Sequence, residues 1–490
     1  MSDCRRRKVR MRRFGTMACP VVLSVLAAGC VPPYTRDLTT LNREQATHDL
    51  DYLVENLKAI HPDPFTRISE KAFAAHVSRV KGALGDATQR KDFSLVLAEV
   101  LAVLGDGHTG HHPYLDFGEY IRGGGKRFPL TLLYQNGAVM VVAWPKEVQP
   151  KRLKVGDTLE AINGNPMSAY LEKIGKYISV SGQKEVLRNW RLVRRFDVYL
   201  WHVEGGADSF EVTLRDAEGE TYVERVSASW SKVVAGPKSK AGTARFAFHL
   251  DGQVCLFRVP RFFGMSAQEF EATVDDVFRQ MKDKKTSVLI VDVRGNSGGN
   301  SGLAIGLLKR TADKGFKTGV KKWRYSKAYE RAMVIGGLKL KGIPSWLLLD
   351  RWVRLHWWFP APVDPSKLEG EYVPAQNGVV EPYKDHWDGT LVLVTDRGTA
   401  SAATHFAVMV KDNELGLIAG EETGGPASGF TEVASLYLPN SGLSCQISSS
   451  HHLRPAGYDD GRGVLPDLPL DVTMEDGDLV ETVYRQIKTE

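Results

Sequence analysis

The stretch TLVLVTDRGTASAATHFAVMV, residues 390–410, decides the fold of the C-terminal half of the chain. Its apolar run TLVLVT predicts a buried strand, and the residues from Ser401 onward predict a helix. A short turn of small residues joins them and places Ser401 at the first turn of that helix, where free N–H groups and the helix dipole favour negative charge. Ser401 is therefore a candidate nucleophile, although a hydroxyl residue in this place commonly only caps the helix.

A second turn of this kind, DVRGNSGGN at residues 292–300, follows the apolar run TSVLIV. Glycines let backbone amides approach a ligand closely, and the sequence lacks the lysine and spacing of a phosphate-binding loop. We expect an amide of Gly298 or Gly299 to pair with that of Ala402 as an oxyanion hole. Alternating strand and helix patterns over residues 244–490 predict a mixed α/β core.

The residues upstream of this core divide into two further regions. Helical periodicity over residues 40–125 predicts a small helical domain, and residues 126–235 have the texture of a β-rich module. A glycine- and lysine-rich linker follows. Within the core, residues 322–388 form an irregular insertion rich in tryptophan, which we interpret as a lid or surface helix because charges interrupt its apolar run.

The N-terminus reads as an export signal. Residues 1–29 hold seven of the 64 Lys and Arg residues, followed by an apolar run too short to span a bilayer. LAAGC resembles a bacterial lipobox, which would make Cys30 the lipidated first residue and residues 30–39 a tether; ordinary signal cleavage is the alternative. We expect a lipid-anchored protein of the bacterial cell envelope, on the periplasmic side or in the outer membrane. The remaining chain is electrically balanced, which argues against nucleic acid as a partner.

Several motifs in order resemble one family. VLIVDVRGNSGGN, LVLVTDRGTASAATHFAV, GLIAGEETGG and GRGVLPDLPLDV, with LGDGHTG far upstream, are similar to the C-terminal-processing (tail-specific) and tricorn-core serine peptidases. GDTLEAINGNP is similar to the PDZ-like module of that family. The resemblance spans residues 40–475 and implies a helical cap, a PDZ-like module and a peptidase core of the ClpP/crotonase-like βαβ type.

The resemblance also implies which residue accepts the serine proton. Processing proteases of the family use a lysine, but Pro426 stands at its position and has no titratable group. The tricorn-like type uses a histidine from the helical region, and GDGHTG places His108 there. His405 is the second candidate base. Asp460 stands where relatives often have a glutamate that orients the histidine, and an acidic turn without that role is its alternative.

These features predict an exported serine-type endopeptidase with Ser401 as nucleophile and His108 as general base. Thr109 is a further polar contact beside the histidine. We expect peptide or protein substrates and no cofactor. We expect no metal site either, because no supporting acidic or further histidine ligand is evident beside HTGHH. The sequence leaves the oligomeric state open. The alternative is a non-catalytic lipoprotein of this fold that binds apolar ligands or peptides, with the tryptophan-rich insertion lining its cavity.

Overall fold

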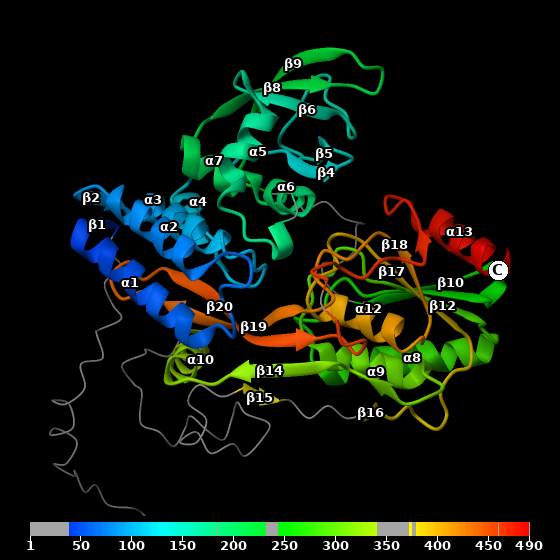
Figure 1. Ribbon diagram of the computed structural model, residues 1–490. Coiled ribbons are helices and arrows are strands. Elements are labelled where there is room, and N and C mark those ends of the chain that lie inside the picture. The colour runs from blue at the N-terminus through cyan, green and yellow to red at the C-terminus, as the bar shows by residue number, and fades with distance from the viewer. Residues whose placement is uncertain are drawn as a thin grey trace, which may run out of the picture.

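The computed structural model describes residues 39–183, 185–231, 244–340, 372–374, 379–458 and 460–489. The described chain forms a helical module, a β-rich module and a larger α/β core, and the predicted mixed α/β class is confirmed (Figure 1). The lipobox cysteine Cys30, the linker and Trp346–Trp358 of the insertion lie outside the described residues.

The core is built on one six-stranded sheet. Its strand order is β10 (Arg245–His249), β11 (Val254–Arg258), β12 (Val288–Asp292), β17 (Thr390–Thr395), β18 (Leu417–Gly420) and β21 (Leu468–Pro469). β10 runs antiparallel to β11, and the other neighbours are parallel. Apolar side chains alternate between two faces. One face packs against α8 (Ala267–Lys284), α9 (Ser301–Thr311) and α12 (Ala402–Asp412), and the other packs against α13 (Asp476–Thr489).

The pairing of β12 with β17 creates the site. The two strands are parallel neighbours in register from Val288 opposite Thr390 to Asp292 opposite Val394. Parallel neighbours end at the same edge of a sheet, and ligand sites of open α/β sheets lie at that edge. The glycine turn after β12 and the serine turn after β17 therefore meet, although about a hundred residues separate them.

A second sheet joins the core to the helical module. It contains β15 (Tyr372–Pro374), β14 (Val320–Arg324), β20 (Ser444–Leu453) and β19 (Gly429–Tyr437), and the short β3 (Gly110–His111) also pairs with β20. Apolar residues of α1 (Arg43–Ile60), α2 (Glu70–Gly82), α3 (Arg90–Ala102) and α10 (Lys327–Leu340) share one core with β19 and β20. α4 (Tyr114–Arg122), the pair β1 (Thr40–Asn42) and β2 (Ala87–Gln89), and the pair β13 (Phe316–Lys317) and β16 (Val379–Val380) complete these modules. The helical module is thus fused to the core.

The β-rich module has a separate apolar core. Its sheet contains β4 (Thr131–Gln135), β5 (Ala138–Ala143), β6 (Thr158–Ile162), β8 (Ser209–Arg215) and β9 (Thr221–Ser227), with β7 (Asn165–Pro166) beside β6. An Asn163-Gly164 turn joins β6 to β7, with both residues at positive φ. Helices α5 (Met167–Gly175), α6 (Glu185–Val193) and α7 (Phe196–Glu204) belong to the same unit.

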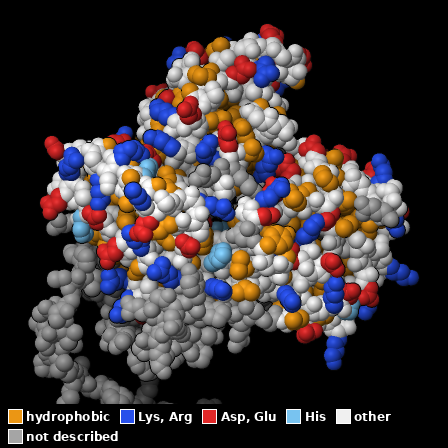
Figure 2. Space-filling view, viewed as in Figure 1, with side chains coloured by type: hydrophobic (Ala, Val, Ile, Leu, Met, Phe, Trp, Pro, Cys, Tyr) orange, Lys and Arg blue, Asp and Glu red, His pale blue; other side chains and the backbone are white. Residues whose placement is uncertain are grey.

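The face of the molecule drawn in Figure 2 has no single dominant charge. Figure 2 shows basic and acidic side chains interspersed over the visible face. Among the residues described, no helix combines the length and apolar character needed to cross a membrane.

Candidate active site

Ser401 occupies a strained turn between β17 and α12. Its backbone angles are φ 53° and ψ −123°, a region that residues other than glycine rarely adopt. Its side chain makes no capping hydrogen bond to the helix. The structure therefore does not support the alternative that the Ser401 side chain only caps the helix. A strained strand-to-helix turn of this kind is the geometry that exposes a nucleophilic serine hydroxyl.

The glycine turn lies directly against this serine. A Cβ on Gly298, whose φ is 102°, would lie 2.7 Å from Ser401 Cβ and 2.8 Å from Ala402 N. The Gly298 N–H itself donates to Asn296 Oδ1 at 2.9 Å. Of the three amides predicted as oxyanion donors, that of Gly298 is therefore already used in a hydrogen bond within the glycine turn. The amides of Gly299 and Ala402 have no hydrogen-bond acceptor within the described chain, so they are the available pair.

The close approach at Gly298 gives a testable expectation. Gly298→Ala should lower kcat/KM by about 10²–10³-fold, because the new methyl group must displace the Ser401 turn and one oxyanion donor. Gly295→Ala is the matched control: φ is 70° there, but its Cβ would meet nothing within 4 Å. Steady-state kinetics of both variants checks this. Equal losses in the two would mean that backbone strain, and not the contact with Ser401, causes the effect.

Ser401 and His108 line one cavity of about 230 Å³. The predicted residues Gly299, Ala402 and His405 line it too, as does Pro426 at the position of the family lysine. Three further titratable side chains that were not predicted for the site also line it: Lys321, Glu432 and His452. The two motifs that suggested a nucleophile and a base, far apart in the sequence, are therefore brought to one site.

The surroundings of His108 favour its neutral form. Burial lowers the pKa of its imidazole, and Arg191 acts in the same direction; Asp106, Glu432 and the Phe430 carbonyl oppose this without reversing it. Its Nδ1 atom is buried and has no partner within the described residues. An imidazole with a pKa below its ordinary value is unprotonated at neutral pH and can accept a proton.

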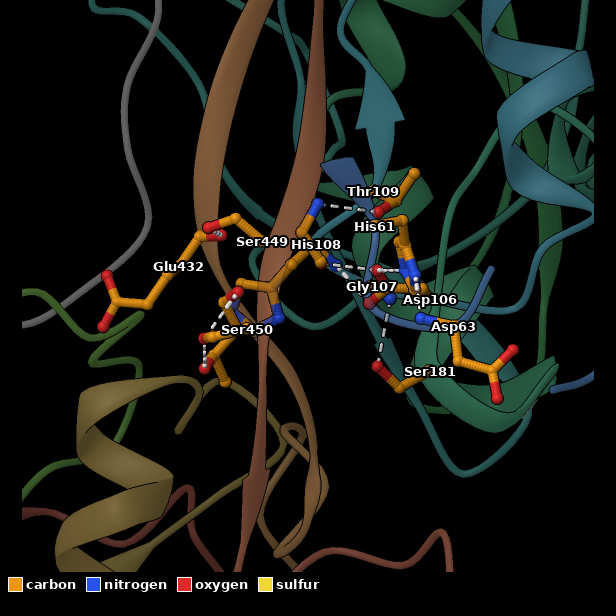
Figure 3. Close-up of polar contacts among 12 residues, drawn as sticks. His61, Asp63, Asp106, Gly107, His108, Thr109, Ser181, Glu432, Ser449 and Ser450 are labelled. Atoms are coloured by element: carbon orange, nitrogen blue, oxygen red, sulfur yellow. Dashed lines mark hydrogen bonds and ion pairs between the residues drawn. The ribbon is translucent and has the colours of Figure 1, made fainter. Parts of the chain in front are cut away.

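Asp106 fixes the loop that carries His108. One of its oxygens accepts the His108 N–H at 3.0 Å, and the other lies 3.1 Å from His61 Nε2 and 2.5 Å from Ser448 Oγ (Figure 3). Burial raises the pKa of this carboxyl, but the hydrogen bond and charge of His61, with His108 and Ser448, hold the pKa well below its usual range. Asp106 is therefore a buried carboxylate that ties the loop to α1 and β20.

Asp106→Asn should reduce stability at neutral pH by about 1–3 kcal/mol, because an amide cannot accept from all three donors. A carboxyl with a lowered folded pKa stabilises the protein above its unfolded pKa, and this contribution is lost as the pH falls. The difference in unfolding free energy between wild type and variant should accordingly be large at pH 7 and shrink below about pH 4. Urea denaturation of wild type and variant at pH 7 and at a pH below about 4 measures this difference. A difference that does not change with pH would contradict the role of Asp106 as a buried carboxylate.

The β-rich module holds the same loop from its other side. Gly107 N–H donates to Ser181 Oγ at 3.0 Å, and Arg191 Nη1 donates to the Gly107 carbonyl at 3.2 Å and to the Ser179 carbonyl at 2.8 Å. Gly182 N–H donates to the Gly105 carbonyl at 3.2 Å. His108 is thus positioned by contacts from all three modules.

The predicted acid Asp460 is not brought to His108. Asp460 is exposed, and its Oδ1 accepts the Arg462 N–H within its own turn at 2.9 Å. The carboxylates whose charges act on His108 are instead Asp106 and Glu432. Glu432 pairs with Lys321 Nζ at 2.5 Å, and its side chain points away from the His108 loop in Figure 3. No acid is therefore hydrogen-bonded to the His108 ring within the described chain.

The other predicted residues have structural partners. Thr109 is buried, and its Oγ1 accepts the Ser448 N–H at 3.0 Å. His405 lines the cavity, but its Nε2 is 2.5 Å from the Thr318 carbonyl. His111 has Ser94 Oγ and the Ser444 carbonyl as partners, and His112 has Arg195. No group of three possible metal ligands occurs in the part of the chain that the structure describes.

Comparison with known proteins gives consistent matches. Residues 253–470 match the model of peptidase family S41. A chloroplastic C-terminal processing peptidase of Tetradesmus obliquus is 39% identical over 82 residues, which are 16% of this chain and only 17% of the relative. The structure of mature CPAF complexed with lactacystin has a TM-score of 0.61 at 17% identity and covers 91% of this chain and 98% of CPAF. A second structure of mature CPAF has a TM-score of 0.58, also at 17% identity, over 87% of this chain and 93% of the other. Identity this low shows a shared fold.

Proposed function

We propose that the protein is a serine peptidase that uses a histidine base, because residues 253–470 match the model of peptidase family S41. Ser401 Oγ would attack the peptide carbonyl while His108 accepts its proton and then returns it to the leaving amine. The amides of Gly299 and Ala402 would donate to the oxyanion. Water would then hydrolyse the acyl-enzyme by the same steps.

One observation carries this proposal: a strained, uncapped Ser401 shares a cavity with a histidine whose pKa is lowered. Strain at a residue other than glycine costs about 1–3 kcal/mol and is typical of active sites. Lys321 is the other basic side chain in the cavity, but its ammonium is paired with Glu432 at 2.5 Å. That ion pair holds the ammonium against Glu432, so Lys321 is the weaker candidate for the base.

A fluorophosphonate probe tests the proposal directly. The folded protein should be labelled at Ser401, located by mass spectrometry of the digested protein. Ser301 is a built-in comparison because it lines the same cavity at the start of α9. Labelling of Ser401 only, lost on heat denaturation, supports an activated nucleophile. A folded protein that resists the probe would support the non-catalytic, ligand-binding alternative.

We further propose that the protein is exported and anchored by lipid at Cys30. The support is the order of basic head, apolar run and LAAGC in the sequence. In a bacterial host, wild-type protein should incorporate a labelled fatty acid and sediment with membranes, whereas Cys30→Ser should do neither. Incorporation that survives Cys30→Ser would exclude this anchor.

A further inference from the structure

A second cavity adjoins the proposed active site. Its volume is about 500 Å³, and it opens where the loop after α1, the segment around Ser181 and the start of β19 meet. Pro426, Gly429 and Phe430 line both cavities and so form their common wall. Nothing in the proposed chemistry uses the second cavity.

The two cavities follow one another along β19. Ser428 lines the second cavity, while Thr431, Glu432 and Val433 line the first. Gly429 and Phe430 line both cavities, so at about 3.3 Å per residue the first cavity extends roughly 10 Å along β19 beyond the common wall, the length of about three residues of an extended peptide. A peptide held at Ser401 can therefore place a nearby residue in the second cavity.

The charges in this cavity are arranged to receive an anion. Arg67 and Lys322 both line it, and neither has a carboxylate partner among the residues described. Lys322 lies opposite His451 in the β14–β20 ladder, and the Arg67 guanidinium lies close to the backbone of Gly461. An arginine fork and a lysine ammonium are the usual partners of a carboxylate.

The acidic side chains of the cavity do not cancel this arrangement. Asp106 lines it but is buried and already accepts from His61, Ser448 and the His108 amide. Asp63 is exposed and is the one remaining carboxylate among the lining residues. Its negative charge disfavours an anion nearby, so removing that charge should strengthen the binding of a carboxylate, whereas removing Arg67 and Lys322 should weaken it.

We infer that this cavity is a specificity subsite that binds a carboxylate of the peptide substrate, from an acidic side chain or from the C-terminus. The inference rests on the proposed function, since it assigns a substrate preference to the same site. The subsite selects peptides with a carboxylate about three residues from the scissile bond.

Cleavage of paired peptides tests the subsite. The sites cut in a proteome-derived peptide library first show where the protein cleaves. Synthetic peptide pairs then carry Glu or Gln at each position within four residues of the cut, and the ratio of kcat/KM for the Glu peptide to that for the Gln peptide measures the preference. Wild type should favour Glu by about three- to tenfold at one position, as expected for partly exposed ion pairs, and added salt should reduce the preference. A second pair, with a free or an amidated C-terminus at that position, identifies a C-terminal source.

Two variants, one of them a double substitution, and one control complete the design. The ratio should fall toward one in Arg67→Gln with Lys322→Gln, and rise in Asp63→Asn. Lys282→Gln, an exposed cation of α8 that lines neither cavity, should leave it unchanged. A ratio near one for both peptide pairs in wild type, or a preference that survives the double variant, overturns the subsite. Fluorophosphonate labelling of Ser401 in the same samples separates that result from failure of the proposed function.

Discussion

Ser401→Ala should abolish peptide cleavage, lowering kcat by about 10⁴-fold or more, and should remove fluorophosphonate labelling completely. The hydroxyl is the proposed attacking group, and its side chain makes no capping hydrogen bond to α12. Cleavage of a fluorogenic peptide and probe labelling measure the two effects. Ser301→Ala, in the same cavity, should keep the labelling of Ser401.

The stability of Ser401 variants separates a functional serine from a structural one. The side chain caps nothing, so Ser401→Ala should change the unfolding free energy by less than about 1 kcal/mol. Ser401→Gly should be more stable than Ser401→Ala, because glycine adopts φ 53° with less strain. A loss of more than about 2 kcal/mol in Ser401→Ala would indicate a structural role and contradict the assignment.

The sequence was sufficient for the βαβ core because its signals are local. The apolar runs before residues 293 and 396 each predict a buried strand, and the structure pairs the two strands in parallel. Whether Ser401 caps the helix or presents its hydroxyl to the cavity depends on its own φ and ψ angles. The sequence of a turn of small residues does not determine these angles. The sequence could therefore nominate the serine but could not choose between its two roles.

The surroundings of His108 were less predictable because they are assembled from distant segments. Asp106 belongs to the GDGHTG motif, but its partners His61 and Ser448 come from α1 and β20 regions far away in the chain. Asp460 was predicted from its position in the sequence relative to the GVLPD motif. A position in the sequence does not determine the direction in which a side chain on a turn points. Its hydrogen bond to the Arg462 amide turns it into its own loop.

His108→Ala should lower kcat/KM by about 10³-fold or more, because the serine loses its proton acceptor. Stability should change little: the His108 Nδ1 atom is buried and has no partner among the described residues, so its removal relieves a desolvation cost of about 1–3 kcal/mol that offsets the lost packing. Kinetics and denaturation of the same preparation measure both. His405→Ala is the matched control, since it removes another imidazole from the same cavity.

The pH at which activity is lost distinguishes a histidine base from a lysine base. Burial lowers the pKa of His108, so the wild-type enzyme should keep its activity as the pH falls to about 6.5 and lose it only below that value. A lysine base would instead lose activity as the pH falls through a higher range, because an ordinary lysine is protonated at neutral pH. The acid limb should disappear from the residual activity of His108→Ala. Persistence of that limb, with activity near wild type, would transfer the role to His405 or Lys321, because both line the cavity beside Ser401.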